Sequence, residues 1–112
     1  MSVENKEHKF PMSSRAYKML LDEANEKDTT VRPLFRRRAA RLVGLREPRF
    51  HLSGDRLNRN FVIGVPDRVY VGLCRMSEVL GVPSDAIGEL VATAILPEDR
   101  LYVRNYSRQQ DA

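Results

Sequence analysis

The stretch FVIGVPDRVYVGL, residues 61–73, changes its hydrophobic period at Pro66 and so predicts a strand that runs directly into a helix. Phe61, Ile63 and Val65 recur at every second position, as expected for a strand with one face against a core. Beyond Pro66 the spacing becomes three or four residues, which is typical of a helix, at Val69, Leu73, Met76 and Leu80. A single strand cannot satisfy its backbone donors and acceptors. A partner strand must therefore lie elsewhere in the chain.

The partner strand is predicted at residues 8–12, HKFPM, which show the same two-residue period. His8, Phe10 and Met12 lie on one face of this strand, and Lys9 and Pro11 lie on the other. We interpret His8 as a packed histidine rather than a metal ligand, because the chain holds one other histidine and a single cysteine. The two predicted strands would then pair as a ribbon.

Two helices are predicted after the first strand. Ser13 or Ser14 is the expected N-cap of the first helix, whose apolar stripe comprises Ala16, Tyr17, Leu20 and Ala24. The second helix is predicted to begin at Thr30 and to end at Gly44 in a left-handed conformation. Its stripe comprises Phe35, Ala39, Leu42 and Val43.

The second half repeats this order of elements. The helix after Pro66 is predicted to end at Gly81, and Ser84 is predicted to cap a further helix. The stripe of that last helix comprises Ile87, Leu90, Val91, Ala94 and Ile95. A shift of 53 residues superposes Arg15, Tyr17 and Leu20 on Arg68, Tyr70 and Leu73, whereas a shift of 52 suits the last helix better. This order favours an internal repeat.

The repeated strand–helix–helix order resembles the ribbon-helix-helix superfamily, the fold of the Arc and MetJ repressors, and its tandem form resembles the TraY-type relaxosome accessory proteins. The expected fold is mainly α with a two-stranded antiparallel β-ribbon, a tandem ribbon-helix-helix pseudo-dimer in one chain. Residues 1–112 would form one domain, with a first copy at 7–43, a linker at 44–59, a second copy at 59–96 and a tail at 97–112. Within the linker, RFHL is a candidate short strand, and the tail carries an apolar patch at Leu101–Val103.

The charge of the chain is unevenly distributed. The net charge is +4, and residues 1–44 carry 10 Lys or Arg against 6 Asp or Glu, while residues 60–112 carry 5 against 7. This excess favours an anionic partner for the first half. The single cysteine, Cys74, suggests a reducing compartment, and no apolar run is long enough to span a bilayer. We therefore expect a cytoplasmic protein without membrane partners.

Catalytic and cofactor motifs are not apparent in the sequence. His8 and His51 are far apart, no glycine-rich loop ends in Lys-Ser or Lys-Thr, and Ser53 and Asp55 lie in a turn without an adjacent histidine base. We therefore expect neither an enzyme nor a protein that needs a metal or another cofactor.

The family resemblance implies contacts with double-stranded DNA. Outward side chains of the ribbon would read bases in the major groove, and the suitable ones here are Lys9, Asn60 and Val62. Pro11 and Gly64 offer no base contact, and Glu7 would repel phosphate. The N-terminus of each second helix would face the DNA backbone, with the phosphate contacts assigned to Thr30, Arg32, Arg36, Arg37 and Ser84. Asp85 beside Ser84 is unfavourable, so the two halves are not expected to contact DNA equally.

The resemblance thus implies a plasmid or phage accessory factor, such as a relaxosome component acting in conjugation, or a transcriptional repressor. The expected partners are double-stranded DNA and other DNA-processing or conjugation proteins, and the chain is expected to be a monomer able to assemble on DNA. The alternative is a protein–protein interaction module on the same scaffold, in which the basic helix binds an acidic partner. RNA binding is disfavoured, because aromatic residues make up only 7% of the chain.

Overall fold

The computed structural model describes residues 5–97, so the predicted patch at Leu101–Val103 lies outside the described residues. Within them, four α-helices pack against one face of a two-stranded antiparallel sheet, formed by β1 (Asn5–Met12) and β2 (Arg59–Pro66). The helices are α1 (Ser14–Glu26), α2 (Val31–Leu42), α3 (Asp67–Leu80) and α4 (Ile87–Thr93), and a 3₁₀ turn, η1 (Ser84–Ala86), precedes α4. The predicted two-stranded antiparallel ribbon is confirmed, and each strand is followed by helices as expected.

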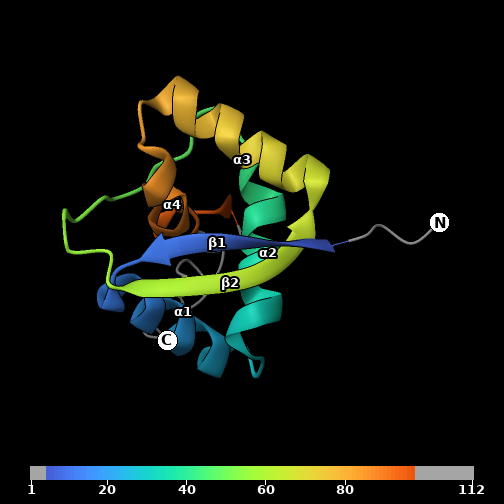
Figure 1. Ribbon diagram of the computed structural model, residues 1–112. Helices are drawn as coiled ribbons and strands as arrows, with labels where there is room; N and C mark the ends of the chain where they lie inside the picture. Colours follow the sequence, from blue (N-terminus) through green and yellow to red (C-terminus); the bar gives the residue numbers. More distant parts are fainter. Residues whose placement is uncertain (1–4, 98–112) are drawn as a thin grey trace, which may run out of the picture.

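The ribbon lies across one face of the molecule, with α2 crossing behind it, α1 on one side, and α3 and α4 on the other (Figure 1). Lys9 lies opposite Val62 and Phe10 opposite Phe61 in the strand register. Because side chains alternate along a strand, this register gives the ribbon an inner face of His8, Phe10, Met12, Phe61, Ile63 and Val65.

The core lies between this inner face and the helices. Phe35 of α2 is fully buried, and its ring centroid lies 5.0 Å from that of Phe10 and 5.1 Å from that of Phe61. Leu20 of α1 and Leu73 of α3 are buried beside them, as their helical spacing predicted. Both strands and all four helices contribute to this core, and losing the Phe35 ring would cost about 3–5 kcal/mol of stability.

Two of the predicted helix ends are confirmed. The Ser13 hydroxyl accepts a hydrogen bond from the Ala16 amide, so Ser13 is the N-cap of α1. Gly81 ends α3 in the left-handed conformation, with φ of 71°. The expectation for Gly44 was wrong: α2 ends at Leu42, and among the described glycines only Gly54 and Gly81 have positive φ. A right-handed turn after α2 needs no glycine there.

The region around α4 also differs from the sequence prediction. Ser84 caps no helix; it begins η1 after Pro83, and α4 starts only at Ile87. The α4 helix ends at Thr93, and the chain is extended at Ala94, so the period changes from helical to two residues. Ile95 is consequently 43% exposed, contrary to its predicted place in the stripe, while Leu96 is buried.

The linker forms no further strand among the described residues. RFHL contributes only an isolated bridge, in which the Ile95 amide donates to the Arg49 carbonyl at 2.8 Å. Residues 50–58 have no regular secondary structure. The linker therefore crosses the end of the molecule, from the C-terminus of α2 back to the start of β2 (Figure 1).

Candidate nucleic-acid interface

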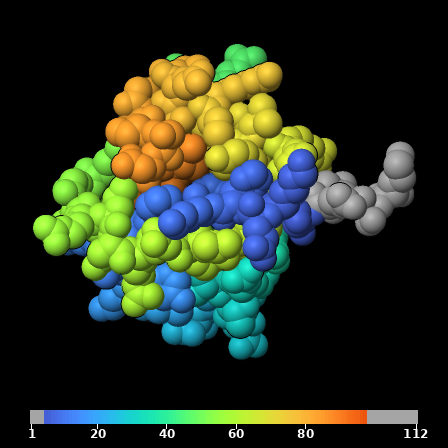
Figure 2. Space-filling view, in the orientation of Figure 1, coloured from blue at the N-terminus to red at the C-terminus, as the bar shows by residue number. Residues whose placement is uncertain are grey.

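The three predicted base-reading residues lie together on the outer face of the ribbon. Lys9 is directly opposite Val62, and Asn60 is opposite Pro11, one pair further along the same face. Lys9 and Asn60 are exposed, and Val62 is 42% exposed although it is apolar. Figure 2 shows both strands at the molecular surface on this side. The structure therefore places a cation, an amide and a branched apolar group side by side.

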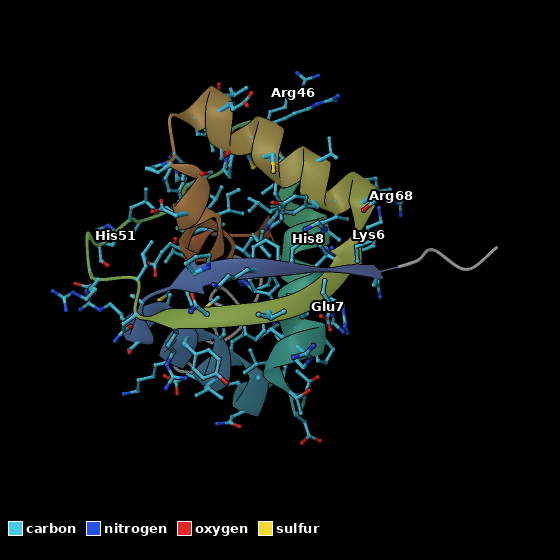
Figure 3. The ribbon with its side chains drawn as sticks, in the orientation of Figure 1. Lys6, Glu7, His8, Arg46, His51 and Arg68 are labelled. Carbon is cyan, nitrogen blue, oxygen red and sulfur yellow. The ribbon has the colours of Figure 1, made fainter. Side chains whose placement is uncertain are left out.

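The other end of this face is less suited to an anionic ligand. Glu7 is exposed and lies opposite Gly64. Gly64 is buried because Asn5 covers it, so that an added Cβ would come 3.1 Å from the Asn5 Cβ. Figure 3 shows Lys6 and Arg68 close to this end of the ribbon, where α3 begins. The Lys6 ammonium pairs with the Asp67 carboxylate at 3.6 Å, which partly offsets its charge.

Arginines of α2 hold this helix against the edge of β2. Nη1 of Arg32 donates to the Val62 carbonyl at 3.2 Å, and Nε of Arg36 donates to the Gly64 carbonyl at 2.7 Å. The outer edge of a two-stranded ribbon otherwise leaves such carbonyls unpaired. Both arginines therefore provide hydrogen-bond donors for carbonyls at the edge of β2. They also hold two positive charges beside the outer face of the ribbon.

An open groove of about 790 Å³ joins the start of α2 to the ribbon, and Thr30, Arg32, Asn60 and Val62 all line it. The first amides of a helix have no partner within the helix. At α2, the Thr30 side chain makes no cap hydrogen bond to them. The groove therefore brings half of the eight predicted contact residues together, beside a helix N-terminus whose amides and dipole favour anions.

The remaining arginines of α2 differ from one another. Arg37 is exposed, as a phosphate contact requires. Arg38, which follows Arg36 and Arg37 directly in the sequence, is only 3% exposed. Its guanidinium donates to the carbonyls of Val91, Ala92 and Ala94 at the end of α4, and to the Glu23 carboxylate at 2.9 Å. Arg38 is thus a structural residue and is unable to contact a phosphate.

Ser84 is exposed, but it does not line the groove that contains Asn60 and Val62. Its neighbours Pro83 and Asp85 line a separate cavity of about 220 Å³ together with linker residues 52–55 and Leu57. The structure therefore leaves Ser84 apart from the other predicted phosphate contacts.

One buried carboxylate, on α4, was missed in the sequence analysis. Glu89 is 4% exposed, and its carboxylate accepts a hydrogen bond from the Ser13 amide at the start of α1. The only sequence signal was a carboxylate within an apolar stretch.

As predicted, His8 is packed: its ring stacks on Tyr70 with centroids 3.6 Å apart, and its Nε2 is buried without a hydrogen-bond partner in the described part of the chain. Burial raises the pKa of Tyr70, and Cys74 adds to this rise.

Residues 5–97 contain no helix that is both long and apolar enough to cross a membrane. Over the same residues, no three His, Cys, Asp or Glu side chains are grouped so that they could hold a metal ion. Comparison of the chain with known protein families, with curated proteins and with solved structures finds no match in any of the three.

Proposed function

We propose that this protein is a tandem ribbon-helix-helix pseudo-dimer that binds double-stranded DNA in the cytoplasm, with the ribbon in the major groove and the start of α2 on the backbone. It would serve as a plasmid or phage accessory factor, such as a relaxosome component, or as a transcriptional repressor. The observation that carries this proposal is the exposed ribbon face bearing Lys9, Asn60 and Val62, which shares a groove with Thr30 and Arg32.

The spacing of the elements supports the pseudo-dimer. The caps of α1 and α3, Ser13 and Pro66, are 53 residues apart, and so are Thr30 and Pro83, which precede α2 and η1. The same shift relates Lys9 to Val62, which is its partner across the ribbon. A two-fold axis between antiparallel strands requires such a self-equivalent pair, and a pseudo-two-fold axis would therefore pass between Lys9 and Val62.

Ring contacts on the inner face support the same relation. Tyr17 of α1 lies 6.2 Å from Phe61 of β2, measured between ring centroids, and Tyr70 of α3 stacks on His8 of β1. A shift of 53 residues converts one pair into the other. Each half would thus place a tyrosine from its first helix against a ring of the strand from the other half.

The chemistry of the outer face suits a duplex. The major groove admits a two-stranded ribbon, and its base edges offer acceptors on guanine, a donor–acceptor pair on adenine and a methyl group on thymine. Lys9, Asn60 and Val62 match these three in turn. Arg32, Arg37 and the Thr30 amide would hold the backbone and set the register. Arg36 would add positive charge, while its Nε stays on the Gly64 carbonyl.

A protein–protein interaction module is the second candidate, and the outer surface of α3 favours it. Val79 is 85% exposed and Val71 is 46% exposed. A groove of about 300 Å³ runs beside Val79, between α3 and the end of α2, and it is lined by Met76 and Val43. Exposed apolar groups beside a groove are typical of protein contacts.

An electrophoretic mobility shift assay over a range of salt concentrations tests the proposal. The full chain is titrated against a random-sequence duplex, the matching single strand and an RNA of equal length. We expect the duplex to bind most tightly, with the logarithm of the affinity falling linearly with the logarithm of salt concentration. Equal binding to all three nucleic acids would contradict specific recognition of double-stranded DNA. No binding to the duplex would contradict the proposal altogether and favour the interaction module.

Single-residue variants then distinguish the residues that contact phosphates from those that read bases. Arg37→Ala should weaken binding to every duplex and reduce the salt slope by roughly 0.9. Arg75→Ala removes the same charge from the exposed side of α3 and serves as the matched control. On a selected site, Lys9→Ala and Asn60→Ala should each cost about 1–3 kcal/mol, with a smaller loss on random DNA. Identical losses for Arg37→Ala and Arg75→Ala would refute the phosphate assignment.

A further inference from the structure

Resting on the proposed function, we infer that the chain recognises a non-palindromic DNA site in a single orientation, with the backbone clamped on the β2 side of the ribbon only. In a symmetric dimer, both halves present the same side chains, so the preferred site mirrors the two-fold axis of the protein. The residues related by the 53-residue shift are therefore the ones that decide this question.

The reading face is chemically different on the two sides of the pseudo-two-fold axis. Lys9 and Val62, which face each other at the axis, are a cation and an apolar group. Exposed Glu7 of β1 corresponds to exposed Asn60 of β2, so that one side presents a carboxylate and the other an amide. A carboxylate accepts from the cytosine amino group, whereas an amide bonds adenine in a bidentate way. The two halves would therefore favour different bases.

The flanks of the ribbon differ as well. On the β2 side, Arg32 is fixed to the Val62 carbonyl at 3.2 Å, within reach of the groove. On the β1 side the corresponding position falls within η1, at Ser84 for a shift of 52 residues and at Asp85 for a shift of 53, and both residues are exposed but supply no cation. The Asp85 carboxylate would repel a phosphate that the guanidinium of Arg32 attracts.

The second clamping arginine also has no counterpart. Arg36 donates to the Gly64 carbonyl, and the same shift relates Gly64 to Pro11. The Pro11 carbonyl instead faces Gly88 of α4, where an added Cβ would come within 2.7 Å of the oxygen. No side chain, and hence no cation, fits between α4 and β1 at this point. The β1 flank therefore lacks both clamps.

Selection from a random duplex pool, followed by phosphate ethylation interference on the selected site, tests this inference. We expect a consensus without inverted-repeat symmetry, and interfering phosphates on one side of its centre. An inverted-repeat consensus with equal interference on both sides would overturn the inference while leaving DNA binding intact. A chain that binds no duplex at all refutes the proposed function, and the inference with it.

Charge variants test whether a positive charge at position 85 creates the phosphate contact that the β1 flank lacks. Asp85→Arg should add interfering phosphates on the second side of the site and steepen the salt slope by about 1. Glu78→Arg makes the same change of charge on α3, eleven residues beyond the pair of Asp67 with Lys6 at the ribbon end. This control should leave the interference pattern unchanged. Indistinguishable patterns for the two variants would show that Asp85 does not face the DNA and would overturn the inference.

Discussion

Replacement of Arg38 by alanine should destabilise the fold severely, although Arg38 belongs to a run of three arginines. Arg38 is only 3% exposed, and every nitrogen of its guanidinium is paired with an acceptor. It donates to the Val91 carbonyl at 3.0 Å and the Ala92 carbonyl at 3.4 Å, and also to that of Ala94. These carbonyls lie at the C-terminus of α4, where a positive charge also interacts favourably with the helix dipole.

The size of the loss follows from what would remain unpaired. Each buried acceptor left without a donor costs about 1–3 kcal/mol. Glu23 would lose its 2.9 Å partner but keep Lys27 at 3.2 Å, so its contribution falls at the low end. We therefore expect a loss of about 4 kcal/mol, within the range of about 3–5 kcal/mol measured for broken buried pairs. A domain of this size has only about 5–15 kcal/mol in total.

Urea unfolding followed by circular dichroism measures this loss. With a slope of about 2 kcal/mol/M, the midpoint of Arg38→Ala should fall by about 2 M. Arg37→Ala, the exposed neighbour, should stay within about 0.5 kcal/mol of the parent chain. Arg38→Lys should fall between them, because one ammonium group does not reproduce the planar fork. A loss below about 1.5 kcal/mol for Arg38→Ala would refute the assigned role.

Three further outcomes are expected. Gly88→Ala should cost about 1–3 kcal/mol in urea unfolding, because its Cβ would meet the Pro11 carbonyl at 2.7 Å; parental stability would contradict this packing. Val62→Ser should leave the melting temperature nearly unchanged but alter site preference in binding assays, since Val62 is 42% exposed; a large fall in melting temperature would show that Val62 is buried. Burial and Cys74 raise the pKa of Tyr70. Its unfolded form then loses the proton first, so stability should fall above about pH 10, and Tyr70→Phe should weaken that fall in alkaline urea titrations; an unchanged fall would exclude Tyr70 as its source.

Much of the fold could be predicted from local sequence pattern. The change of period at Pro66 locates both β2 and α3, and the spacing of Leu20 and Leu73 identifies the buried faces of α1 and α3. Strand pairing followed because one strand needs a partner for its backbone groups. Gly81 was predictable as a helix end, because a left-handed residue is favourable only without a Cβ.

The candidate site was only partly predictable. Alternation along the strands sufficed to place Lys9, Asn60 and Val62 on one outer face, because a period of two fixes which side chains share a face. The groove between this face and Thr30 depends on how α2 packs against the edge of β2, which the sequence does not encode locally.

The fates of three adjacent arginines show what only the tertiary structure decided. Arg36, Arg37 and Arg38 are chemically identical and consecutive, so composition and charge alone predict the same role for all three. Successive residues on a helix point about 100° apart, and the packing of α2 turns one toward the edge of β2, one toward solvent and one beneath α4. Local pattern determines which elements form, because period and capping act over a few residues. The partners of Arg36 and Arg38 lie 15 to 56 residues away in the sequence, and these segments meet only when the core forms.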